Sequence, residues 1–108
     1  MRRRHGHAPK FSLARVQELV RLGEPHVHIT MSAVAGARAL YMSAGDIVDC
    51  ISDMTEEDYE QTLESISIPG TFQDVYKPRY EGFAIYLKVR MVEDRQTIVI
   101  SFKRNESP

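Results

Sequence analysis

Apolar and polar residues alternate along two segments near the end of the chain, residues 83–92 and 97–103. A period of two is typical of a β-strand with one buried face. The charged stretch 93–96 between them has the length of a hairpin turn, so we expect the two strands to pair antiparallel. The residues predicted to share the apolar face are Phe83, Ile85, Leu87, Val89, Met91, Ile98, Ile100 and Phe102.

The opposite face of this hairpin, called the polar face below, carries cations and hydroxyls and no carboxylate. It is predicted to contain Ala84, Tyr86, Lys88, Arg90, Val99, Ser101 and Lys103. Solvated surfaces ordinarily mix charges of both signs, so this composition favours a bound polyanion. From the pattern alone, a plain solvated face and a nonspecific anion patch stay open as alternatives.

Four helices are predicted before this hairpin. Ser12, Ser32 and Ser43 are candidate N-caps, each followed by apolar residues at helical spacing. Thr55 is followed three residues later by an acid, which is the capping-box pattern. The helices are expected to run from Ser12 to about Leu22, from Ser32 to about Tyr41, from Ser43 onward, and from Thr55 to about Ile66.

A short edge strand is predicted at residues 26–30, because Pro25 blocks a helix and the residues after it alternate. Pro69 and Gly70 then separate the helical part from the sheet. Helices first and strands last indicate an α+β fold, in which N-terminal helices pack on one face of a C-terminal antiparallel sheet.

The chain of 108 residues is expected to form one domain, residues 1–108, around a single core. Its net charge of −1 conceals a polarised distribution: residues 1–15 carry bases and no acid, whereas residues 44–64 carry acids and no base. We interpret residues 1–10 as a mobile basic tail and the acidic segment as the solvated outside of two helices.

Cys50 is the single cysteine, so no internal disulfide is expected, and its apolar neighbours predict a buried, structural thiol. No apolar run approaches the roughly 18 residues needed to span a membrane. The Arg-rich start lacks the apolar core of a secretory signal. These features favour a cytoplasmic protein that does not enter a membrane.

Two histidine pairs, His5/His7 and His26/His28, have the spacing that places both rings on one side of a strand. No cysteine cluster or acidic partner stands at ligand spacing from them, so we predict no metal site. The acidic segment also lacks the glycine that a calcium-binding loop needs at its turn. No cofactor is expected.

Cleavage of an RNA backbone without a metal needs a base for the 2′-hydroxyl proton, cations for the charge on the transition state, and an acid for the 5′-oxygen. RNA supplies its own nucleophile, so neither a serine nor a cysteine is required. Tyrosine and crowded lysines can fill the remaining roles. Tyr86, Lys88, Arg90 and Lys103 meet this condition in the predicted hairpin.

Three strings carry a resemblance to a known family: Gln73-Asp74-Val75-Tyr76 with Pro78-Arg79, then Tyr86-Leu87-Lys88, then Ser101-Phe102-Lys103. Over nearly its whole length the chain resembles the MqsR family of bacterial mRNA interferase toxins, which belong to type II toxin–antitoxin modules and have a RelE-like fold. The resemblance implies a metal-independent, sequence-selective endoribonuclease that inhibits translation by cleaving mRNA.

By position, the resemblance implies three catalytic residues, Gln73, Tyr86 and Lys103. The cations expected to bind RNA are Lys77, Arg79, Lys88, Arg90 and Arg104. The family also uses a lysine on the element before the sheet, which we expect to be helical, and Gln61 occupies that place here. Glutamine supplies neither a proton nor a positive charge, so the alternative is a catalytically weakened homologue that binds antitoxin and nucleic acid as a regulator.

The resemblance further implies an MqsA-like antitoxin, with a zinc-containing N-terminal region and a DNA-binding region. Operator DNA is then bound only through the antitoxin complex. The acidic residues 44–64 and the edge strand near Val27 are two candidate surfaces for this partner, and the sequence does not decide between them.

Overall fold

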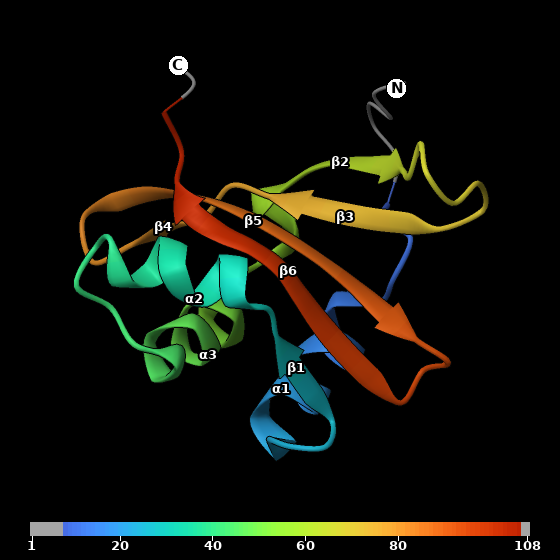
Figure 1. The fold of residues 1–108 in the computed structure, drawn as a ribbon, viewed down its shortest axis with the longest axis horizontal. Helices are drawn as coiled ribbons and strands as arrows, with labels where there is room; N and C mark the ends of the chain where they lie inside the picture. The colour runs from blue at the N-terminus through green and yellow to red at the C-terminus, as the bar shows by residue number, and fades with distance from the viewer. Residues whose placement is uncertain (1–7, 107–108) are drawn as a thin grey trace.

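The computed structural model describes residues 8–106, which form one mixed sheet with three helices packed against it (Figure 1). The strand order is β1-β6-β5-β3-β2, and the short β4 pairs with β5. His5, His7 and the first seven residues of the predicted tail lie outside the described residues. The helices and strands are α1 (Leu13–Leu22), β1 (Val27–Ile29), α2 (Met31–Arg38), α3 (Ala44–Asp53), β2 (Tyr59–Glu64), β3 (Phe72–Tyr76), β4 (Arg79–Tyr80), β5 (Phe83–Val92) and β6 (Gln96–Arg104).

The first three predicted helices are confirmed. Ser12 caps α1 by accepting a hydrogen bond from the backbone N–H of Arg15, and Ser43 forms a capping box with Asp46 at the start of α3. Helix α2 begins earlier than expected, because Thr30 and not Ser32 is its N-cap. None of these helices has the length and apolar character needed to cross a membrane.

The predicted fourth helix is wrong. The capping box of Thr55 and Asp58 exists, but it starts only a single 3-10 turn, Glu56–Asp58, and the chain continues as β2. The buried Thr62 explains the change, because its hydroxyl donates a 2.6 Å hydrogen bond to Asp74 on β3. Pairing with a neighbouring strand therefore outweighs the local helical signal.

The sheet is antiparallel except at its edge. The predicted hairpin of β5 and β6 is confirmed, and the predicted edge strand appears as β1. Strand β1 runs parallel to β6, pairing Val27 with Thr97 and Ile29 with Val99, so the expectation of a wholly antiparallel sheet is corrected there. Strand β1 connects α1 to α2, and along this path it runs in the same direction as β6.

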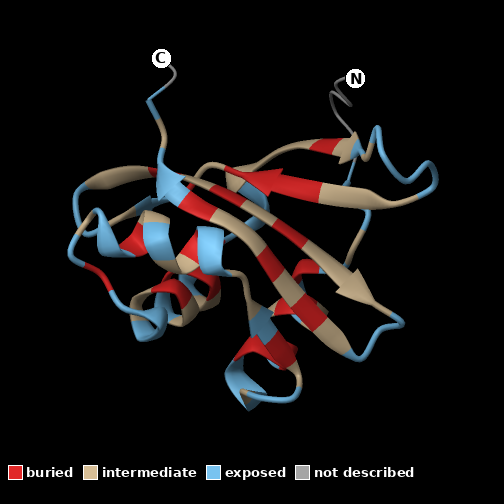
Figure 2. Cartoon of the chain, in the orientation of Figure 1, coloured by how far each residue is buried: buried red, intermediate tan, exposed pale blue. Residues whose placement is uncertain are grey.

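The helices cover one face of the sheet, as the α+β prediction requires, and buried residues line this layer (Figure 2). Cys50 lies in the core as expected, and burial raises the pKa of its thiol to about 12, so the sulfur stays protonated and unreactive. Helix α2 packs so tightly on β6 that a Cβ added at Gly36 would overlap the carbonyl oxygen of Phe102.

Asp74 is a buried carboxylate that ties the start of the chain to the sheet. It is fully buried on β3 and accepts hydrogen bonds from the backbone N–H groups of Lys10 and Phe11, both at 2.9 Å, besides the one from Thr62. Charged acceptors form hydrogen bonds about twice as strong as neutral ones. Asp74 therefore fixes where the chain enters α1.

We expect Asp74→Asn to lower the free energy of unfolding by about 1–3 kcal/mol, because the amide nitrogen would face a donor and leave a buried group unsatisfied. Urea denaturation measures the change. Asp94→Asn is the matched control, since the exposed Asp94 only bridges the half-exposed Arg15, and it should change stability by less than about 0.5 kcal/mol. Equal effects of the two substitutions would contradict the anchoring role.

Candidate functional site

Tyr86 and Lys103 face each other on the polar face. They are direct partners across β5 and β6, and the Lys103 Nζ lies 5.3 Å from the centre of the Tyr86 ring. Lys103 is exposed and Tyr86 is half-buried, so neither side chain turns into the core. The ammonium over the ring is a cation–π contact, which holds the two side chains close together.

A β-bulge produces this pairing. Lys88 pairs with Ser101, but the next residue on β5, Val89, pairs with Val99, so Ile100 is an extra residue without a partner on β5. The bulge corrects our assignment of faces in β6: Val99 is buried and not on the polar face, whereas Ile98 and Ile100 are only half-buried. Strict alternation fails because an inserted residue reverses it.

The polar face extends from the hairpin onto β3 and β2. Lys88 is the partner of Val75, and Val75 is the partner of Gln61, so these residues form one row across three strands that Ser101 continues on β6. Gln61 therefore lies on a strand, and our placement of it on a helix is corrected. A lysine at this place would project beside Val75, but Gln61 adds no charge there.

Gln73 lies along the strands from the Tyr86–Lys103 pair and not directly beside it. The register of β3 and β5, in which Asp74 pairs with Val89, places Gln73 beside Arg90. Arg90 is four residues from Tyr86, which corresponds to about 13 Å along a strand. The structure therefore brings Tyr86, Lys103 and Lys88 together and sets Gln73 apart with Arg90.

The cations differ in how far they are engaged. Lys77 lies 3.9 Å from the carboxylate of Glu60, and Arg79 on β4 donates a 3.2 Å hydrogen bond to the carbonyl of Gly82. Within residues 8–106, no ion pair is formed by the remaining predicted RNA-binding cations or by Lys103. Among the described residues, these cations are Lys88, Arg90, Lys103 and Arg104, and Arg79 forms its hydrogen bond but likewise no ion pair.

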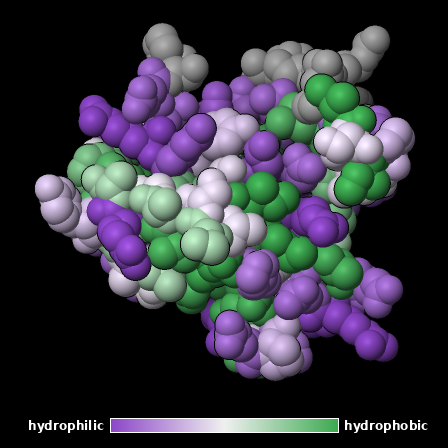
Figure 3. All heavy atoms as spheres, in the orientation of Figure 1, coloured by the Kyte–Doolittle hydropathy of each residue, from purple (hydrophilic) through white to green (hydrophobic). Residues whose placement is uncertain are grey.

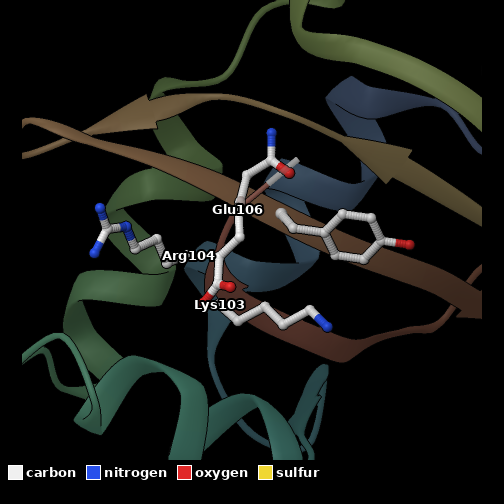
Figure 4. Close-up of a pocket in the computed structure, with 5 residues that line it drawn as sticks. Lys103, Arg104 and Glu106 are labelled. Carbon is white, nitrogen blue, oxygen red and sulfur yellow. The ribbon is translucent and has the colours of Figure 1, made fainter. Parts of the chain in front are cut away.

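A pocket of about 440 Å³ opens beside the pair. It is lined by Tyr86, Lys103, Arg104, Asn105 and Glu106. The side chains of Lys103 and Arg104 extend in opposite directions from β6 (Figure 4). Hydrophilic side chains gather around the C-terminal end of β6 (Figure 3). Our sequence reasoning missed Asn105 and Glu106, since they follow the last strand and no periodicity marks them.

Burial raises the pKa of the Tyr86 phenol above its ordinary value. The phenol therefore keeps its proton at neutral pH and can donate a hydrogen bond or a proton. In the part of the chain that the structure describes, no group of three or more histidine, cysteine or acidic side chains is arranged to hold a metal ion. The groups that line the pocket are the phenol of Tyr86, the ammonium group of Lys103, the guanidinium of Arg104, the amide of Asn105 and the carboxylate of Glu106.

The fold and the site together define a small α+β protein with an open sheet face that presents unpaired cations beside a protonated tyrosine. A protein-family model described as "Motility quorum-sensing regulator, toxin of MqsA" matches residues 8–104. The chain is also 30% identical over 95 residues to the mRNA interferase toxin MqsR of Escherichia coli (strain K12), an alignment that covers 88% of this chain and 93% of that protein. The chain belongs to the MqsR toxin family.

Proposed function

We propose that this chain is an mRNA interferase, an endoribonuclease that cleaves mRNA without a metal and thereby inhibits translation. The observation that carries the proposal is the Tyr86–Lys103 pair, which lines a solvent-open pocket. The Lys103 Nζ lies 5.3 Å from the centre of the Tyr86 ring. Family membership and the name of the E. coli relative, an mRNA interferase toxin, support it.

In the proposed reaction, the ribose 2′-oxygen bonds to phosphorus and the bond from phosphorus to the 5′-oxygen breaks. Lys103 lies against the scissile phosphate and balances the charge that develops on it. Tyr86, which keeps its proton at neutral pH, protonates the departing 5′-oxygen. The 2′-hydroxyl proton passes to the carboxylate of Glu106, which lines the same pocket. The products carry a 2′,3′-cyclic phosphate and a 5′-hydroxyl.

Gln73 and Arg90 have a different role in this proposal. Since they lie about 13 Å along the strands from the pair, they contact a neighbouring nucleotide and not the scissile phosphate. An amide can read a base edge and a guanidinium can bind a phosphate, so these two residues contribute to sequence selectivity. Lys88, between the two positions, binds the connecting phosphate.

The proposed partners are mRNA and an antitoxin. The matching family is described as the toxin of MqsA, which supports an MqsA-like antitoxin. A zinc-containing region in that antitoxin, and operator DNA bound only through the toxin–antitoxin complex, are further parts of the proposal. Two surfaces remain candidates for binding the antitoxin. One is the acidic outside of α3 together with residues 56–64, and the other is the edge strand β1.

Gln61 favours a second candidate function, a catalytically weakened toxin that acts as a regulator. Its uncharged amide stands in the row of Val75 and Lys88, where a lysine would add a cation to the polar face. Expression in bacteria separates the two functions. A nuclease stops growth and its Lys103→Ala variant does not, whereas a regulator is equally harmless in both forms.

The direct test incubates the purified protein with a long single-stranded transcript in EDTA. We expect discrete fragments whose new 5′ ends accept phosphate from a polynucleotide kinase without prior phosphatase treatment, since the ends are hydroxyls. Mapping these 5′ ends gives the cleavage sequence. No cleavage, or cleavage that requires Mg²⁺, would overturn the proposed mechanism.

A further inference from the structure

The bulge at Ile100 decides which side chain of β6 faces Tyr86. On the hairpin side of the bulge, Val92 pairs with Gln96 and Val89 with Val99. A ladder continued in that register would pair Lys103 with Ile85, on the buried face, and would turn Phe102 outward. The extra residue shifts the register by one position, so Lys103 reaches Tyr86 while Val99 and Phe102 both stay in the core.

A single side chain from the other end of the sequence holds this bulge. The Thr30 hydroxyl donates a 2.9 Å hydrogen bond to the carbonyl of Ile100, the extra residue. The Thr30 backbone N–H donates to the carbonyl of Val99 at 3.1 Å. Bulged residues leave backbone groups without ladder partners, and Thr30 satisfies one of them.

The same hydroxyl also starts the helix that lies against the next part of β6. Thr30 Oγ1 accepts a 3.1 Å hydrogen bond from Ala33 and caps α2. Helix α2 then packs on β6 at Gly36, whose α-carbon faces the carbonyl of Phe102 and the Cβ of Lys103. The hydroxyl therefore joins three features: the bulge, the start of α2 and the strand segment that carries Lys103.

We propose that Thr30 is a positioning residue that sets Lys103 opposite Tyr86 through its hydrogen bond to the bulge. This inference rests on the proposed nuclease function. Thr30 is not among the residues that line the pocket, and its side chain hydrogen-bonds to Ile100 and Ala33, so it acts on the reaction through the geometry of β6.

Three substitutions separate the two hydrogen bonds of the hydroxyl. Thr30→Ser keeps both the donor and the acceptor. Thr30→Asp keeps the acceptor that caps α2, because aspartate is a good N-cap, but it loses the donor to Ile100. Thr30→Val loses both. Ser12→Ala is the matched control, since it removes the side-chain cap of a different helix, α1.

Cleavage of a defined RNA is measured at saturating and at subsaturating substrate, and rates are corrected for the folded fraction. We expect kcat to fall about 10- to 100-fold in Thr30→Val and Thr30→Asp with KM nearly unchanged, because displacement of a reacting group by about 1 Å has effects of this size. Thr30→Ser and Ser12→Ala should retain the kcat of the unsubstituted protein.

A readout without RNA keeps the inference separate from the proposed function. Nuclear Overhauser effects between the Lys103 side chain and the Tyr86 ring are expected in the unsubstituted protein and in Thr30→Ser, and are expected to be lost in Thr30→Asp and Thr30→Val. If the unsubstituted protein does not cleave RNA, the proposed function fails while these contacts still test the positioning. Unchanged contacts and unchanged kcat in Thr30→Asp would overturn the inference, as would an equal fall of kcat in Ser12→Ala.

Discussion

Lys103→Ala is expected to lower the single-turnover rate of RNA cleavage by about 10²- to 10³-fold, the usual effect of removing one group that stabilises charge in a transition state. Lys103 is exposed and makes no ion pair within residues 8–106, so the substitution should change stability by less than about 0.5 kcal/mol. The rate is measured with saturating protein over end-labelled RNA, and a thermal transition checks the fold.

Arg104→Ala is the matched control for this prediction. It removes the same charge from the adjacent residue, but the Arg104 side chain extends away from that of Lys103 (Figure 4). We expect a modest loss of RNA affinity that disappears at higher salt, with the rate of the chemical step unchanged. Equal losses of rate in the two variants would mean that only total charge matters, as in a nonspecific anion patch.

Tyr86→Phe tests the other half of the pair through its pH dependence. The pKa of Tyr86 is raised by burial, and the proposed acid is the protonated phenol. Cleavage by the unsubstituted protein should therefore fall as pH rises through that raised pKa. The phenylalanine variant should cleave about 10²-fold more slowly and show no such alkaline fall. The same alkaline fall in both proteins would assign the titration to another group.

The second large effect is expected for Gly36→Ala, which should lower the free energy of unfolding by about 2 kcal/mol or more. Alanine favours a helix over glycine by about 1 kcal/mol. The added methyl group, however, would overlap the carbonyl oxygen of Phe102 and force α2 away from β6, and overpacking of this kind costs about 1–3 kcal/mol and occasionally more. Urea denaturation gives the change from the midpoint at constant slope.

Gly45→Ala is the control for the same substitution in a helix. Its added methyl group would meet only the Ser43 hydroxyl, at an ordinary contact distance of 3.4 Å. We expect this variant to be as stable as the original protein or more stable by up to about 1 kcal/mol. If the two alanine variants change stability equally, the close approach of α2 to β6 does not limit position 36.

Local patterns predicted the parts of this molecule that depend on neighbours in sequence. The β5–β6 hairpin, the caps at Ser12 and Ser43 and the polar face of β5 each follow from a period or a capping residue. The same reasoning failed at residues 59–64, where a helix signal was real for one turn and pairing with β3 then decided the structure.

The remaining features depend on contacts between distant residues, which no local period records. The bond from Thr30 to Ile100 joins residues 70 apart, and Asp74 binds backbone groups 63 and 64 residues away. The bulge at Ile100 cannot be recognised from the sequence, because the apolar residues around it fit the register with the extra residue and the register without it. For the same reason, the sequence did not predict that Gln73 lies beside Arg90, about 13 Å along β5 from Tyr86.

The extra residue in β6 has a consequence for how the gene can change in length. Because Ile100 has no partner on β5, loss of its codon would leave an unbroken ladder, in which Phe102 still pairs with Leu87 and Lys103 with Tyr86. The loss would instead remove the carbonyl group to which the Thr30 hydroxyl donates its hydrogen bond. A codon gained or lost in the exposed turn at 93–95 also leaves β5 and β6 in register, so natural length variation of one residue should be found at that turn and at the bulge.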